Sequence, residues 1–141
     1  MRRIVVAVSG VALGLVLAAP AMRAQQAQDV GVIDKTMKAV GPAFGAARKA
    51  LDAGDMAAAK TAAESMSKSF VETEGFFKSH GKADGVEWAQ TAQKAADGIA
   101  AAASPDAAKA PAGELGKLCA GCHAKYRDRA ADGSYNYKAG A

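Results

Sequence analysis

The sequence has few of the residues that favour β-strands, and little proline. Its 141 residues include only four prolines, and β-branched residues are sparse where alanine is abundant. No stretch alternates between apolar and polar residues strongly enough to rise above a helical periodicity. We therefore expect an all-α protein.

Signatures of catalysis are also missing. We find no serine or cysteine nucleophile with an accompanying base, no paired carboxylates in a recognisable site and no phosphate-binding loop. The chain is therefore not expected to be an enzyme. A structural zinc site is disfavoured because it needs four ligands. Besides Cys119 and Cys122 only His80 and His123 are available, and His123 is too close to Cys122 for the usual Cys2His2 spacing.

A basic and then apolar segment opens the chain. Met1–Arg3 is basic, Ile4–Ala19 is an apolar run, and small residues follow up to Ala24. This order is typical of a secretory signal peptide, and the run is too short for a membrane span. We expect residues 1–24 to be removed, which would leave a periplasmic or otherwise extracytoplasmic protein without a membrane attachment. An uncleaved membrane anchor is the alternative.

The positive charge of the chain belongs largely to this segment. The full sequence has 18 basic and 14 acidic residues. Without Arg2, Arg3 and Arg23, 15 basic residues remain against 14 acidic ones. This near balance gives no reason to expect nucleic-acid binding.

Four amphipathic helical segments can be drawn in the rest of the chain. Apolar residues recur every three or four positions over about 29–53, 55–79 and 83–103. A fourth helix ends near Arg129 and starts either at Pro105 or after Pro111. Short connections between such helices favour an antiparallel, up-down-up-down four-helix bundle. We expect this bundle to occupy residues 25–129.

A short tail, residues 130–141, follows the expected bundle. Asp132-Gly133 is expected to form a turn that folds Tyr135 and Tyr137 back onto the helices. A disordered tail is the alternative.

The most informative motif is Cys119-Ala-Gly-Cys122-His123 in the last helix. This C-x-x-C-H pattern is the attachment signal of a c-type haem. Two thiols one helical turn apart can each add to a vinyl group of the porphyrin, and the next histidine supplies a neutral imidazole to the iron. We expect one haem c per chain, covalently held by Cys119 and Cys122, with His123 as the proximal ligand. A haem-free helical interaction module with a Cys119–Cys122 disulfide is a further alternative.

With this motif, the chain resembles the class II cytochromes c, the cytochrome c′ family. Cys119–Arg127 looks like the family's C-x-x-C-H-x-x-[YF]-R ending, Met37–Gly45 is similar to its first helix, and Glu87-Trp88 to the opening of its third. One departure concerns Ile33, which stands where the family often has an arginine near a haem propionate. The resemblance implies a four-helix bundle around one haem.

The resemblance also implies that Met37 faces the iron opposite His123. A methionine there is typical of the low-spin branch, in which His/Met ligation favours single-electron transfer. We therefore expect a periplasmic electron-transfer protein. The alternative is that Met37 only fills the core and that a five-coordinate iron binds NO or CO. His80 is a rival ligand, although an exposed histidine at a helix end is the simpler interpretation.

Three further residues are candidates for the haem pocket. Arg127 lies one turn after His123, where it would cover the ring face or the solvent edge, and Phe44 and Trp88 would form walls. Each has an ordinary alternative, a solvated arginine or plain core aromatics. Redox proteins are the expected partners, and homodimerisation stays open.

Overall fold

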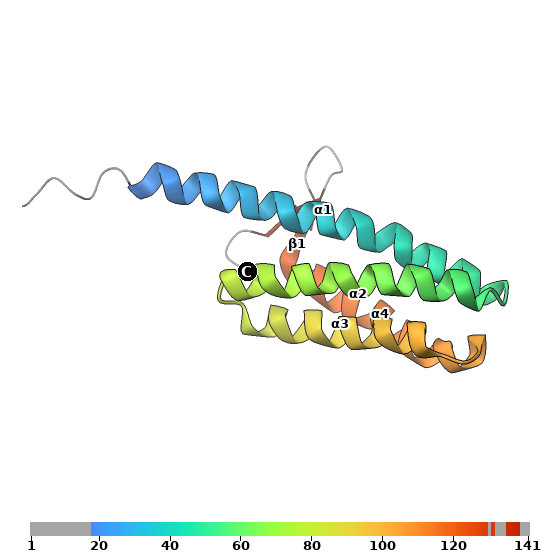
Figure 1. Ribbon diagram of the computed structural model, residues 1–141. Helices are drawn as coiled ribbons and strands as arrows, with labels where there is room; N and C mark the ends of the chain where they lie inside the picture. The colour runs from blue at the N-terminus through green and yellow to red at the C-terminus, as the bar shows by residue number, and fades with distance from the viewer. Residues whose placement is uncertain (1–17, 130, 132–134, 139–141) are drawn as a thin grey trace, which may run out of the picture.

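The computed structural model describes residues 18–129, 131 and 135–138, with side chains from Gly31 onward. Four helices follow one another: α1 (Ala18–Asp52), α2 (Met56–Ser79), α3 (Ala83–Ala101) and α4 (Pro105–Tyr126). Each packs against the next in the chain, and the direction reverses at every connection (Figure 1). The expectation of an all-helical chain with four packed helices is confirmed, apart from one short two-stranded ribbon after α4.

The connections explain where the inner helices begin and end. The Asp55 carboxylate accepts a hydrogen bond from the backbone N–H of Ala58 at 2.9 Å and so caps α2. Gly54 and Gly81 have φ angles of 75° and 65°, which only glycine adopts without strain. The predicted helix over 55–79 is thereby confirmed, and the third helix ends two residues before the predicted position, at Ala101.

The start of α1 differs from the prediction. The helix begins at Ala18 rather than Asp29, because the residues in between are mainly alanine, methionine, arginine and glutamine, all good helix formers. Most of the predicted signal peptide, residues 1–17, lies outside the described residues. Within the described ranges, no helix combines the length and the apolar character that a membrane crossing requires.

The structure decides between the two starts considered for the fourth helix. α4 begins at Pro105, where the Ser104 hydroxyl accepts a hydrogen bond from the Ala107 N–H at 3.2 Å, and it continues through Pro111. It ends at Tyr126, so the predicted end near Arg129 is wrong. The chain leaves the helix there because Arg127–Arg129 becomes strand β1.

Strand β1 pairs with β2 (Tyr135–Tyr137) in a small antiparallel ribbon that the sequence analysis missed. Arg127 lies opposite Tyr137, and Arg129 lies opposite Tyr135. The prediction that these tyrosines fold back is confirmed, since the Tyr137 ring stacks on Tyr126 and meets Phe76 edge-on. The boundary drawn after Arg129 therefore cuts through a folded unit. The predicted turn at Asp132-Gly133 lies outside the described residues.

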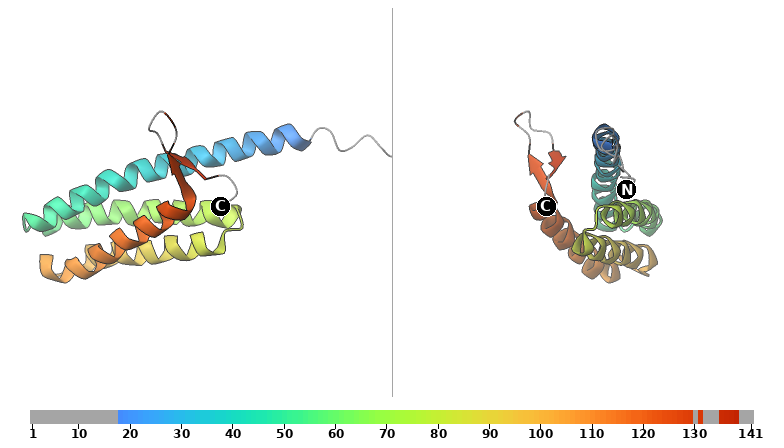
Figure 2. Two further views of the ribbon diagram at one scale, coloured as in Figure 1. Left: turned by 180° about the vertical axis from the view of Figure 1, so that it is seen from behind. Right: turned by 90° about the vertical axis from the view of Figure 1, so that its left-hand side faces the viewer.

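The helices form an arc that is not closed by direct packing between α1 and α4. Contacts are extensive between α1 and α2, between α2 and α3 and between α3 and α4, but α1 and α4 meet at few points. The end-on view in Figure 2 shows this arc, with the ribbon rising from α4 on the side that faces α1. Many buried core residues are alanines, among them Ala47, Ala63 and Ala96. Two further alanines, Ala89 and Ala92 of α3, line the space inside the arc.

Candidate functional site

A cavity of about 430 Å³ lies inside the arc and is lined by residues of all four helices. We call it the helix cavity. Its volume is within the range of about 300–1,000 Å³ that is usual for ligand sites. Most of its wall is apolar, and these walls are formed by Val40, Phe44, Phe70, Phe77, Trp88, Ala89, Ala92 and Leu118.

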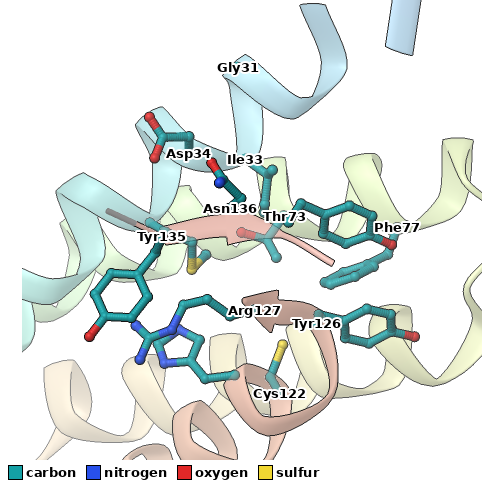
Figure 3. Close-up of a pocket in the computed structure, with 13 residues that line it drawn as sticks. Gly31, Ile33, Asp34, Thr73, Phe77, Cys122, Tyr126, Arg127, Tyr135 and Asn136 are labelled. Atoms are coloured by element: carbon teal, nitrogen blue, oxygen red, sulfur yellow. The ribbon is translucent and has the colours of Figure 1, made fainter. Parts of the chain in front are cut away.

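A second cavity of about 280 Å³ adjoins it on the side of the ribbon. We call it the strand cavity, because Tyr135, Asn136 and Tyr137 of β2 line it together with residues of α1, α2 and α4. Figure 3 shows Tyr135 and Arg127 on one side of this space, Phe77 and Tyr126 on the other, and Cys122 pointing into it from α4. The two cavities share several lining residues, namely Asp34, Met37, Thr73, Phe77, Cys122, His123, Arg127 and Tyr135.

The structure brings all seven candidate site residues to the helix cavity. Met37 and Phe44 come from α1, Trp88 comes from α3, and the other four lie at the end of α4 or directly after it. These four are Cys119, Cys122, His123 and Arg127. Residues more than 80 positions apart in the chain thus line one space, and this could not be derived from the motif alone.

Both cysteines are free thiols and half-buried. Burial raises the pKa of Cys119, and burial together with the neighbouring Cys119 raises the pKa of Cys122 to about 11. Both thiols therefore stay protonated at neutral pH. Nucleophilic redox cysteines have lowered pKa values instead, so the environment does not favour a thioredoxin-like pair.

His123, the last residue of the motif, is half-buried. Burial lowers its pKa, and the positive charge of Arg127 lowers it further. Both effects favour the neutral imidazole, which is the form that binds a metal ion.

Met37 occupies a central position in the wall. It is half-buried and packs against both hydrophobic clusters of the protein, one around Met66 and Phe70 and the other around Phe76 and Phe77. It also lines both cavities. Its thioether is therefore available to a group bound in the cavities. The packing contacts of Met37 do not require such a group.

Arg127 stands at the junction of the two cavities. Its Cζ atom lies 3.9 Å from the centroid of the Tyr135 ring, an arrangement favourable for a cation–π interaction. Among the ion pairs of the described residues none involves Arg127. The guanidinium is thus held by an aromatic face and keeps its charge available at the site.

Four residues that line both cavities were not predicted from the sequence as site residues, namely Asp34, Thr73, Phe77 and Tyr135. Phe77 follows the apolar spacing of every three or four residues in α2, but nothing in that periodicity marks one such residue as facing a cavity. Tyr135 lies in a three-residue strand, which is too short for a pattern to reveal.

His80 is separate from both cavities. Its Nδ1 atom is 2.8 Å from the carbonyl oxygen of Phe76, and its ring stacks on the Phe76 ring at 4.2 Å. It lines neither cavity, so the structure does not bring this rival ligand to the motif. Across the described ranges, no three histidine, cysteine, aspartate or glutamate side chains gather as a metal site of their own.

Comparisons of the chain with protein-family profiles, with curated proteins and with solved structures found no match. Function is therefore inferred from the motif and from the geometry around it.

Proposed function

We propose that the protein is an extracytoplasmic c-type cytochrome that carries single electrons. The supporting observation is that Met37 of α1 and His123 of α4 line the same apolar cavity as the two thiols of the C-x-x-C-H motif. A thioether, an imidazole and two thiols are together the donor set that suits a covalently attached haem with His/Met ligation. Bound haem would supply reversible one-electron exchange at its iron.

The residues of the cavity suit this cofactor in three respects. The thiols of Cys119 and Cys122 would each add S–H across one vinyl double bond, a step that needs no oxidant and releases no leaving group. His123 would provide its neutral imidazole and Met37 its sulfur. Because these two ligands would be held by separate helices, coordination would change little between the two oxidation states.

The apolar walls have a separate role in this proposal. Phe44, Phe70 and Trp88 line the cavity and would keep water away from most of the porphyrin. A low-polarity surrounding disfavours the extra positive charge of ferric iron and so raises the reduction potential. A methionine ligand raises it as well. The polar and charged lining residues Asp34, Lys38 and Arg127 would then lie toward the solvent edge.

Attachment is tested first with the exported protein. Purified chain should keep a haem-stained band on a denaturing gel, and Cys119→Ser combined with Cys122→Ser should remove it. A band that is absent from the unaltered protein matured with the haem-attachment machinery would contradict the proposal.

Ligation is tested by isosteric removal of the thioether. Met37→Leu should convert a low-spin ferric spectrum with a weak far-red sulfur band into a high-spin spectrum. Met56→Leu is the matched control, since Met56 is half-buried on α2 and lines neither cavity. A spectrum unaffected by Met37→Leu would refute ligation by Met37.

A second function, binding of NO or CO to a five-coordinate iron, is favoured by one observation. The strand cavity extends beside Met37 toward Ile33 and Tyr137, and this is room for a diatomic ligand. In that case the unaltered protein would be high-spin and would bind carbon monoxide readily, and Met37 would be a packing residue.

A further inference from the structure

Strand β2 adds a further link between α1 and α4, which touch each other directly at few points. The backbone N–H of Lys138, directly after β2, donates to the Tyr126 carbonyl oxygen at 2.8 Å. The Tyr137 ring is nearly parallel to the Tyr126 ring, with the centroids 5.8 Å apart, and meets Phe76 edge-on at 5.1 Å. On its other side β2 contacts α1. The strand is therefore fixed to α4 and α2 and reaches the opposite wall of the site.

Tyr135 is the residue of β2 that lines both cavities. It is 47% exposed, so part of its ring faces solvent while another part faces the site. Tyr135 and Tyr137 are two positions apart and lie on the same face of the strand. Anchoring of Tyr137 therefore fixes the orientation of Tyr135, and the guanidinium of Arg127 holds the Tyr135 ring from one side at 3.9 Å.

We infer that Tyr135 is a specificity-determining residue of this site, which narrows the opening between α1 and α4 and selects exogenous iron ligands by their size. The inference rests on the proposed function, because it needs a haem iron ligated by His123. Small ligands would pass beside the ring, whereas larger ones would have to displace both the ring and the guanidinium that stacks on it. The selectivity for ligand size would come from strand β2 and not from the four helices.

The experiment compares two ferrous ligands of the same chemistry class but different bulk, carbon monoxide and n-butyl isocyanide. The haem-loaded Met37→Leu protein is the background, so that entry does not wait for release of the thioether. Association rates are measured after flash photolysis. Tyr135→Ala should raise the association rate of n-butyl isocyanide about tenfold and that of carbon monoxide less than about twofold.

Two further variants complete the test. Tyr135→Phe keeps the ring, so the size discrimination should persist, and Tyr135→Trp should slow the larger ligand. Val71→Ala is the matched surface control, because Val71 is 51% exposed on α2 and lines neither cavity. A melting curve shows whether each variant is folded.

The outcomes separate this inference from the proposed function. Equal rates for Tyr135→Ala and the background, or an equal acceleration of both ligands, would overturn the role of Tyr135 while leaving the cytochrome assignment intact. If Tyr135→Ala does not fold, an unchanged rate in Tyr135→Trp overturns the inference in the same way. A purified chain without covalent haem would overturn both.

Discussion

At the scale of single residues, Gly85 and Phe77 are interdependent. A Cβ atom at Gly85 would lie 2.3 Å from Cδ1 of Phe77, far inside van der Waals contact. Phe77 is fully buried and lines both cavities. The missing side chain at the start of α3 thus allows a large ring on α2 to reach the wall of the site.

Gly85→Ala is predicted to destabilise the protein by about 1–3 kcal/mol, because an overpacked core forces side chains out of their preferred rotamers. Gly75→Ala is the control. A Cβ atom there meets nothing within 4 Å, and replacing an exposed helical glycine stabilises by up to about 1 kcal/mol. Denaturant unfolding of both haem-loaded variants measures the difference. Equal effects would show that Phe77 moves aside without cost.

The residue scale is also where the sequence was most informative about the site. Cys119, Cys122 and His123 lie within five consecutive residues, so their relative positions depend only on local helix geometry. The sequence motif is therefore sufficient to predict them as a group. Met37 could be suggested only by resemblance. Its place on the same cavity wall depends on how α1 packs, which no local pattern contains.

At the scale of the elements, Asp84 joins the start of α3 to the end of α4. Its carboxylate accepts hydrogen bonds from the Lys125 ammonium and from the Tyr126 hydroxyl, the latter at 2.7 Å. The hydrogen bond from Lys125 has the largest effect and the one from Tyr126 the next. Together they lower the pKa of Asp84 from its ordinary value of 3.8 to about 2. The contact lies at the end of the bundle that carries the C-x-x-C-H motif.

This lowered pKa predicts that the contact of Asp84 with α4 is sensitive to acid. Because the folded state prefers the ionised carboxylate, the stabilisation is complete above pH 3.8 and is lost as the pH falls toward 2. Unfolding free energy measured from pH 5 to pH 2 should fall more steeply in the unaltered protein than in Asp84→Asn. Parallel curves would show that the lowered pKa does not contribute to stability.

The helices could be predicted where apolar periodicity determines them. Their ends could not be predicted where contacts with distant residues determine them. Apolar spacing was sufficient for the bodies of all four helices. The start of α1 was misplaced because propensity continues upstream of Asp29 without a cap that the pattern could reveal. The end of α4 was misplaced because Arg127–Arg129 leaves the helix to pair with Tyr135–Tyr137, and strands of three residues carry no measurable alternation.

At the scale of the whole molecule, the arc of helices encloses space that its own side chains do not fill. The core is rich in alanine, and α1 and α4 meet at few points. That opening follows from the sparse contact between α1 and α4, so it could not be predicted from the four helical patterns. It is also the feature that would give the motif room for the proposed haem.

We predict that the haem-free chain is loosely packed. Cys119→Ser combined with Cys122→Ser should keep helical circular dichroism but bind a hydrophobic dye and melt without a sharp transition, because the cavity walls lose their filling. A cooperative melt at the temperature of the haem-loaded protein would contradict this.

The sparse contact between α1 and α4 also has a consequence for the order of folding. Helices α1 to α3 are joined by short turns and pack as neighbours along the chain, so their contacts are local and form quickly. The contact of α4 with α1 joins distant parts of the chain, so we expect it to form last. The motif at the end of α4 would then be the part of the site whose burial is completed latest. Under the proposed function, we expect the thiols to remain within reach of an attachment partner until folding ends.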